Sequence, residues 1–184
     1  MEGILFEYDS NRQLSAFKSG CYKDVKRILI CIGGLSNGFL SLPYYYKIAE
    51  MFLIEQNRDF GWCLVQVLLS SSYSQWGYSS LAKDCEEVDL LIDHLLKIHP
   101  NLLEICLLGH STGSQDCVYF LKNGKHKQRI CKVILQAGVF RYPGIDAISS
   151  FPLPESIKFF AIFRCSVKFL CGFDSEYSLS ETPA

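Results

Sequence analysis

The stretch Leu103-Glu104-Ile105-Cys106-Leu107-Leu108-Gly109-His110-Ser111-Thr112-Gly113-Ser114-Gln115-Asp116 decides how this chain folds. Its apolar run from Ile105 to Leu108 has the length and composition of a strand that is buried on both faces of a sheet. The run ends in the pattern Gly-x-Ser-x-Gly, after which residues 113–121 follow a helical pattern. The sequence therefore predicts a strand, a tight turn at Ser111 and a helix.

The two glycines that flank Ser111 explain how so tight a turn can form. Gly109 and Gly113 carry no side chain, so the backbone on either side of the turn can approach closely. In such a nucleophile elbow the serine stands exposed at the end of the strand, and Ser111 is the candidate nucleophile. The N–H of Thr112, at the start of the helix, is the natural first donor of an oxyanion hole. The alternative is a strand-to-helix turn whose serine has no chemical role.

A second glycine-rich loop follows an earlier apolar run. Residues 27–32, Arg-Ile-Leu-Ile-Cys-Ile, predict a buried strand, and Gly33-Gly34-Leu35-Ser36-Asn37-Gly38 comes directly after it. A flexible backbone at the end of a strand can lie close to a ligand, so we expect the Leu35 N–H to be the second oxyanion donor. A plain turn into the next helix would explain the same glycines.

The loop over residues 70–79 is the third candidate for a part of the site. It follows the buried run Trp62 to Leu69, and loops at the carboxyl ends of strands are where α/β sheets hold their ligands. Its aromatic residues are candidates for a pocket wall, although aromatic side chains in loops more often pack for stability. The residues that we expect around the pocket are Gly34, Ser36, Tyr73, Trp76 and His110.

Strand patterns and helical patterns alternate along most of the chain. The short runs 4–8 and 14–17, separated by a turn-rich segment, predict an antiparallel hairpin. Helices are predicted from Pro43 to about Gln56 and from Ser80 to His99, the second with its acidic residues mostly away from its apolar face. With a last strand at 130–137, this series predicts an α/β fold. Right-handed crossovers would place successive strands side by side in a mostly parallel sheet.

Composition and charge exclude several classes of function. The chain has 184 residues, of which 49% are hydrophobic and 20% charged, as expected for one folded domain. A net charge of −1 without a dense basic run gives no sign of nucleic-acid binding, and residues 122–129 are expected to be a solvated basic loop. The apolar run 157–171 is interrupted by three basic residues, so no membrane span is expected. The first residues lack a basic segment typical of a secretory signal, which favours a cytoplasmic location.

The cysteines are expected to be reduced. The chain has nine of them, an odd number, and several lie inside apolar strand-like runs. No Cys-x-x-Cys pair is present, and His94 and His99 are five residues apart, which does not place both on one helical face. We therefore expect no metal site, and no sequence motif indicates a cofactor.

Three motifs, in this order, identify a resemblance. They are Ile32 to Gly38 with Pro43-Tyr44, Val65 to Tyr73 with Gly77 to Leu81, and Leu108 to Asp116. Together they resemble a poorly characterised, DUF1749-like family of α/β-hydrolases that is found in fungi and plants and includes fungal siderophore-ester hydrolases. The similarity extends from about residue 4 to Ala137. The extension Ser-Thr-Gly-x-Gln-Asp in the elbow is far rarer than the bare elbow.

This resemblance implies a fold, a substrate class and three site residues. The fold is an α/β-hydrolase with helices on both faces of a mostly parallel sheet, and the substrate is a small-molecule ester. Ser111 matches the nucleophile, and Leu35 and Thr112 match the positions that donate to the oxyanion. Family members continue with two more strands, an acid loop and a late histidine, which nothing after Gly138 resembles. We therefore expect residues 1–138 to be the N-terminal part of a hydrolase domain that is incomplete at its C-terminal side, and 139–184 to be a divergent segment, as a splice variant, frameshift or shortened gene model would produce.

The base of a catalytic triad has no clear candidate. A serine hydroxyl needs a base within hydrogen-bond reach, and α/β-hydrolases supply serine, acid and histidine in that order. The histidines are His94, His99, His110 and His126. Only His126 follows Ser111, but it lies in a loop expected at the opposite end of the sheet, and the side chain of His110 should diverge from that of its neighbour. Asp146 is a candidate acid without a histidine to orient. The sequence thus predicts a hydrolase fold with little or no turnover.

Three alternatives follow from this incomplete triad. The chain could be an active serine esterase that an unforeseen base or a partner chain completes. It could be a non-catalytic binding module that retains the pocket. It could also be an unstable truncated product, whose missing strands leave an exposed sheet edge that promotes aggregation.

Overall fold

A computed structural model describes residues 1–21, 23–54, 59–138, 158–163 and 166–169, so the expectations for Asp146 and for most of 139–184 lie outside the described residues. The elements in chain order are β1 (Ile4–Asp9), β2 (Leu14–Gly20), β3 (Arg27–Ile32), α1 (Pro43–Leu53), β4 (Trp62–Val67), η1 (Gln75–Tyr78), α3 (Leu81–Ile98), β5 (Glu104–His110), α4 (Gly113–Asn123), η2 (Lys127–Arg129), β6 (Ile130–Gln136), β7 (Lys158–Phe163) and β8 (Ser166–Phe169). Each predicted strand and helix of residues 1–137 is present.

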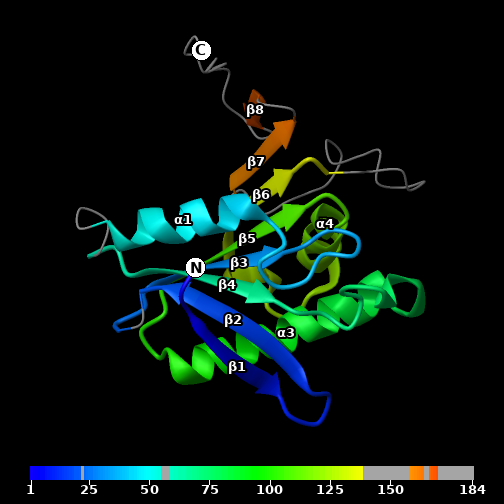
Figure 1. Cartoon of the computed structure of the whole chain (residues 1–184), viewed down its shortest axis with the longest axis horizontal. Helices are drawn as coiled ribbons and strands as arrows, with labels where there is room; N and C mark the ends of the chain where they lie inside the picture. The colour runs from blue at the N-terminus through cyan, green and yellow to red at the C-terminus, as the bar shows by residue number, and fades with distance from the viewer. Residues whose placement is uncertain (22, 55–58, 139–157, 164–165, 170–184) are drawn as a thin grey trace.

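One sheet runs through the molecule, with the strand order β1-β2-β4-β3-β5-β6-β7-β8 (Figure 1). Strands β4, β3, β5, β6 and β7 are parallel to their neighbours in that series, while β1 and β2 form the predicted antiparallel hairpin and β8 is antiparallel to β7. The α/β class and the mostly parallel sheet are therefore confirmed.

The order of the central strands corrects one prediction. Successive strands do not all lie side by side, because β5 pairs with β3 and not with β4. The chain leaves β4 through α3 and returns to the free side of β3, so the strand order reverses at β3. In open α/β sheets such a reversal opens a crevice at the carboxyl ends of the strands, which is where ligands bind. The loops after β3 and β5 meet at this point.

The edge of the last predicted strand is paired. Residues 132–136 of β6 lie in parallel register with residues 158–162 of β7, and β8 then pairs with β7. The 130–137 strand is therefore not at the edge of the described sheet, which ends instead at β8.

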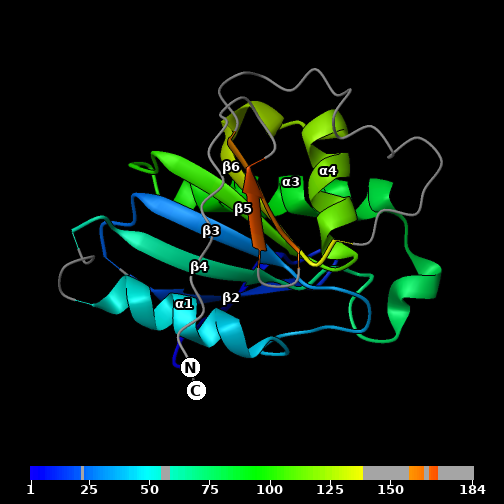
Figure 2. The ribbon, with the colours of Figure 1, turned by 90° about the horizontal axis from the view of Figure 1, so that it is seen from above.

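Helices cover both faces of the sheet, as predicted. Figure 2 shows α1 on one face and α3 with α4 on the other. In β3, alternate residues serve the two faces: Ile28, Ile30 and Ile32 belong to the core under α3 and α4, whereas Leu29 and Cys31 pack with Tyr45 of α1. A strand buried in this way has no polar face, which explains its uninterrupted apolar sequence.

The helix ends follow local signals. Pro43 stands in the first turn of α1, which ends at Leu53, short of the predicted Gln56. The Ser80 side chain caps α3 by accepting a hydrogen bond from the Lys83 N–H. No helix in the described part of the chain is long and apolar enough to cross a membrane.

The described cysteines are all free thiols, and most of them are buried, as predicted. They are Cys21, Cys31, Cys63, Cys85, Cys106, Cys117 and Cys131.

Candidate active site

Ser111 occupies a strained backbone turn between β5 and α4. Its φ is +52°, a left-handed conformation that non-glycine residues rarely adopt. The Ser111 N–H donates to the Gln136 carbonyl at the end of β6 (2.9 Å), and the Ser111 carbonyl accepts from the Ser114 N–H in the first turn of α4 (3.1 Å). Bonds on both sides of the turn hold this strained conformation, which is the backbone geometry of a nucleophile elbow.

The flanking glycines allow the close approach that the sequence predicts. A Cβ atom on Gly109 would lie 2.4 Å from the Gly113 carbonyl oxygen. A Cβ atom on Gly113 would lie 2.4 Å from the carbonyl oxygens of both Ile32 and Gly33. The start of α4 therefore packs directly on the end of β3, and this contact brings the turn at Ser111 beside the loop that follows β3.

The loop after β3 is folded on itself by one asparagine. The Asn37 side chain accepts a hydrogen bond from the Gly34 N–H (2.8 Å), and the Asn37 N–H donates to the Gly34 carbonyl (2.9 Å). The N–H groups of Leu35 and Thr112 have no hydrogen-bond partner among the described residues. Both expected oxyanion donors are therefore available at neighbouring strand ends. Asn37 is not among the site residues predicted from the sequence, although a short amide in a glycine-rich loop is a common signal for such local bonds.

A pocket of about 270 Å³ lies beside this turn. Gly34, Leu35 and Thr112 belong to its lining, and Trp76 of η1 lines it from the loop after β4. Ser111 is not itself among the lining residues, but its neighbours in sequence and in space are, so the serine stands next to the pocket.

The remaining pocket candidates lie outside this lining. The Tyr73 ring packs where a Gly38 side chain would be, and its hydroxyl accepts a hydrogen bond from the Phe39 N–H (3.4 Å). The His110 ring bonds to the Gln136 side chain and lies near the Tyr44 ring, with 6.0 Å between centroids. Ser36 is exposed.

Two buried aspartates line the pocket, and neither is among the site residues predicted from the sequence. Asp84 in the first turn of α3 is 5% exposed, and Asp116 in the first turn of α4 is 8% exposed. The Ser79 hydroxyl donates to Asp84 (2.9 Å), whereas Oδ1 of Asp116 has no hydrogen-bond partner among the described residues. Burial, together with the nearby Asp84, raises the pKa of Asp116 to about 8. The Ser-Thr-Gly-x-Gln-Asp extension contains Asp116 but does not indicate that it is buried.

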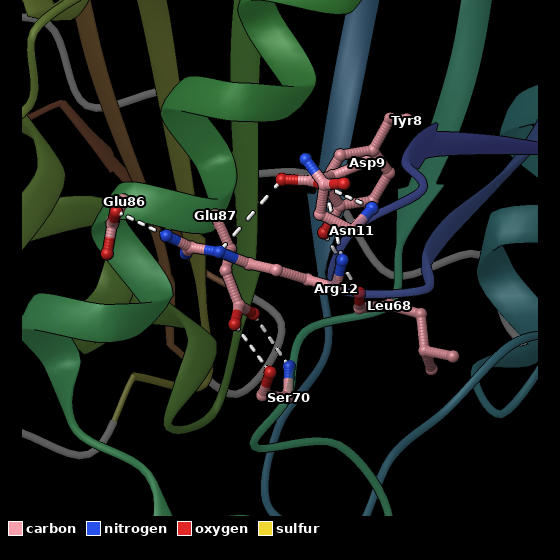
Figure 3. A network of polar contacts seen from close by, with 8 residues as sticks. All are labelled: Tyr8, Asp9, Asn11, Arg12, Leu68, Ser70, Glu86 and Glu87. Carbon is pink, nitrogen blue, oxygen red and sulfur yellow. Dashed lines mark hydrogen bonds and ion pairs between the residues drawn. The ribbon is translucent and has the colours of Figure 1, made fainter.

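A buried glutamate fixes the start of the pocket loop. Glu87 of α3 is fully buried and accepts hydrogen bonds from the N–H of Ser70 (2.7 Å) and from its hydroxyl. Figure 3 shows this contact beside a second one, in which Arg12 of the β1–β2 hairpin pairs with Glu86 (2.7 Å). The hairpin also reaches the end of β4, because the Tyr8 hydroxyl donates to the Leu68 carbonyl (3.1 Å). Thus α3 and the hairpin together position the loop that carries Trp76.

The histidines all have partners elsewhere. His94 stacks on Phe6 with 5.3 Å between ring centroids, and Nε2 of His99 lies 3.5 Å from the Lys18 ammonium. Nε2 of His126 lies 2.8 Å from Asp93, and His110 bonds to Gln136. Burial lowers the pKa of both His94 and His99. Within the described residues, no hydrogen bond joins an imidazole to the Ser111 hydroxyl.

A cluster of possible metal ligands lies at the other end of the sheet. Ligand atoms of Glu104, Cys106 and Cys131 lie within 4.8 Å of one another. However, Glu104 already pairs with Arg27 (2.9 Å) and Lys132 (3.6 Å), so cationic side chains occupy its carboxylate. These contacts make the cluster a poor metal site.

The family model described as "Protein of unknown function (DUF1749)" matches residues 1–145. The chain belongs to the DUF1749 family. The resemblance identified from the three sequence motifs is confirmed.

Relatives of this DUF1749 chain include hydrolases. It is 32% identical over 135 residues to "Esterase AN6793" of Emericella nidulans, covering 68% of this chain and 34% of the relative. A solved "Alpha/Beta hydrolase fold protein of unknown function" matches with a TM-score of 0.62 and 32% identity, covering 74% of this chain and 44% of the other. The siderophore hydrolase EstB from Aspergillus fumigatus matches with a TM-score of 0.60 and 26% identity, covering 76% and 43%.

The fold is therefore that of the α/β-hydrolases, and the similar proteins include an esterase and a siderophore hydrolase. The chain spans less than half the length of the curated relatives it matches, 45% and 34% for two of them.

Proposed function

We propose that this chain carries the nucleophile and the oxyanion hole of a serine ester hydrolase. Ser111 would attack the ester carbonyl, and the N–H groups of Leu35 and Thr112 would bind the oxyanion that forms. The observation that carries the proposal is the backbone of Ser111, whose φ of +52° at the junction of β5 and α4 turns the serine out of the sheet beside a pocket. The esterase and siderophore hydrolase among the similar proteins make esters the substrate class to test first.

We also propose that these 184 residues by themselves hydrolyse esters only slowly. The hydroxyl of a serine is a poor nucleophile at neutral pH unless a base takes its proton. Each of the four histidines has a partner other than Ser111. Without a base, the oxyanion hole and substrate binding still provide a residual acceleration of about 10³- to 10⁴-fold over water in a protease that lacks its triad.

The first experiment compares the wild-type chain with Ser111→Ala in the hydrolysis of p-nitrophenyl acetate. Because the base is missing, we expect the two rates to differ by less than about a hundredfold. A larger difference would show that a base is present and would overturn the proposal of slow turnover. A fluorophosphonate probe provides a second measurement, since rapid labelling of Ser111 requires an activated hydroxyl.

The second experiment tests the role of Ser111 by supplying the base from solution. Free imidazole can enter an open site and take the proton that no histidine of the chain takes. We expect imidazole to accelerate the wild-type reaction more than that of Ser111→Ala, after subtraction of the reaction without protein. Equal acceleration of both proteins would contradict a nucleophilic role for Ser111. Saturable ester binding with equal acceleration would support a non-catalytic binding module.

A further inference from the structure

The pocket beside Ser111 has an acidic wall with an unsatisfied carboxylate oxygen. Asp116 is 92% buried, that is 8% exposed, and its Oδ1 has no hydrogen-bond partner among the described residues. Asp84 lines the same pocket from the neighbouring helix. Among the described residues that line the pocket, none is lysine, arginine or histidine. A buried carboxylate without a partner costs free energy, which a cationic ligand in the pocket would offset.

We infer that Asp116 and Asp84 form a subsite for a positively charged amino group, so that the pocket prefers esters that carry an alkylammonium group. The class of substrate rests on the ester function proposed above, whereas the binding of the ammonium group rests on the acidic wall alone. Asp116 lies five positions after Ser111 in the sequence, at the first turn of the helix that begins at the elbow. A ligand that contacts both residues would place its amino group and its ester carbonyl within one pocket.

The two aspartates differ in what they offer to a ligand. Asp84 already accepts a hydrogen bond from the Ser79 hydroxyl (2.9 Å), and the neighbouring Ser71 also favours its charged form. Asp116 lines the pocket, and its buried Oδ1 accepts no hydrogen bond from the described residues. An ammonium group is a compact charge with three donors, which suits one free carboxylate oxygen supported by a second carboxylate and nearby hydroxyls.

An inorganic divalent cation fits this wall less well. Calcium takes six to eight oxygen ligands, and magnesium demands near-ideal octahedral geometry. Among the described residues, no third acidic, histidine or cysteine side chain lies close enough to the two aspartates to share a metal ion with them. The only such group of three in this part of the chain is the Glu104 cluster at the other end of β5. The raised pKa values of Asp84 and Asp116, caused mainly by burial, agree with a wall that lacks a positive charge until a ligand arrives.

The test measures binding and not turnover. Ser111→Ala protein is titrated in a calorimeter with methyl esters of amino acids whose amino group is separated from the carboxyl group by two, five or seven methylene groups. Each is compared with the neutral ester in which a methyl group replaces the ammonium group. At about pH 8 the amines stay largely protonated, because alkylamines titrate near the lysine value of about 10.4. For at least one length we expect the ammonium ester to bind about tenfold more tightly or better.

The same preference is then measured after substitution of the acids. Asp116→Asn and, separately, Asp84→Asn each replace a carboxyl group by an amide of nearly the same volume, and we expect the preference to fall to about twofold or less in Asp116→Asn. Glu86→Gln is the matched control, since it removes a charge from the exposed side of α3 and should leave the preference unchanged. Circular dichroism verifies that each variant is folded.

Three results would overturn the inference. The ammonium esters could bind no better than the neutral esters at every length. The preference could persist in both aspartate variants. Calcium or magnesium chloride could bind in an Asp116-dependent manner and displace the ammonium ester, which would make the wall a metal site. Failure of the proposed ester hydrolysis can be distinguished from failure of this inference. If only the ester hydrolysis fails, hexylamine still binds in an Asp116-dependent manner, but imidazole does not activate Ser111.

Discussion

Gly34 lies against Ser111 so closely that a Cβ atom added to Gly34 would stand 2.9 Å from the Ser111 Cβ and 3.1 Å from the His110 carbonyl oxygen. This contact joins the loop after β3 to the turn after β5. Hydrogen bonds to β6 and α4 hold Ser111 in its strained conformation, so the turn cannot move away from Gly34 without breaking them. The expected nucleophile and the loop that carries the Leu35 N–H are thereby kept at a fixed separation.

Substitution of Gly34 by alanine should therefore impair the chemistry of the site. We expect Gly34→Ala to lower the Ser111-dependent, imidazole-supported hydrolysis of p-nitrophenyl acetate by about 10- to 100-fold, since small displacements of reacting groups have effects of this size. Gly77→Ala is the control, because a Cβ atom there would meet nothing within 4 Å, and it should leave the rate unchanged. Equal rates in the two variants would show that this contact does not position Ser111.

The elbow and the loop after β3 could be predicted from sequence because their signals are local. A strand of four or five apolar residues, a glycine at each close approach and a helical pattern beyond the turn are all adjacent in the chain. The tight contacts at Gly109 and Gly113 agree with the reason that the sequence analysis gave for those glycines. The positions of the α1 and α3 helices followed from periodicity in the same way.

The strand order and the acidic wall could not be predicted in this way. Whether β5 joins β3 or β4 depends on which edge is free, and no local pattern records that choice. Helical periodicity placed the acids of α3 mostly away from its apolar face, but Asp84 and Glu87 are buried there. Their partners, Ser79 and Ser70, belong to the loop after β4, so their burial depends on a tertiary contact.

The buried Asp116 predicts a stability that depends on pH. Its pKa of about 8 in the folded protein lies above the ordinary aspartate value of about 3.9 in an unfolded chain. Between these values the folded protein holds a proton that the unfolded chain has lost. The free energy of unfolding should therefore fall as the pH rises from about 4 to about 8, and then stop responding to this group.

Asp116→Asn should remove this part of the pH dependence. Urea denaturation at several pH values between 5 and 8 measures it, and the stability of the variant relative to wild type should rise steadily with pH. The titratable groups near Asp116 are Asp84, whose pKa is also raised, and the thiols of Cys85 and Cys117. These groups are present in both the wild-type protein and Asp116→Asn. A constant difference across this range would contradict a protonated Asp116.

Glu87 and Glu86 allow a test of the contact that holds the pocket loop. We expect Glu87→Ala to lower the free energy of unfolding by about 1.5–3 kcal/mol, because Ser70 loses a charged partner inside the protein. The amides of residues 70–79 should then exchange faster in hydrogen-exchange measurements. Glu86→Ala, on the exposed side of the same helix, should change neither quantity much, since its partner Arg12 is also exposed. If both variants behave alike, Glu87 does not hold the loop.

His110, next to the proposed nucleophile Ser111, provides the sharpest test of the proposal that the chain lacks a base. The His110 ring bonds to the Gln136 side chain and lies near Tyr44, which directs it away from the pocket lining. If His110 were the base, its replacement would lower the Ser111-dependent rate by about 10²- to 10⁴-fold. We expect His110→Asn, which retains a group that can bond to Gln136, to leave the Ser111-dependent rate without added imidazole within about tenfold of wild type. The measurement is made beside Ser111→Ala, because a loss as large as in that variant would identify His110 as a participant in the chemistry and would overturn the assignment of an incomplete triad.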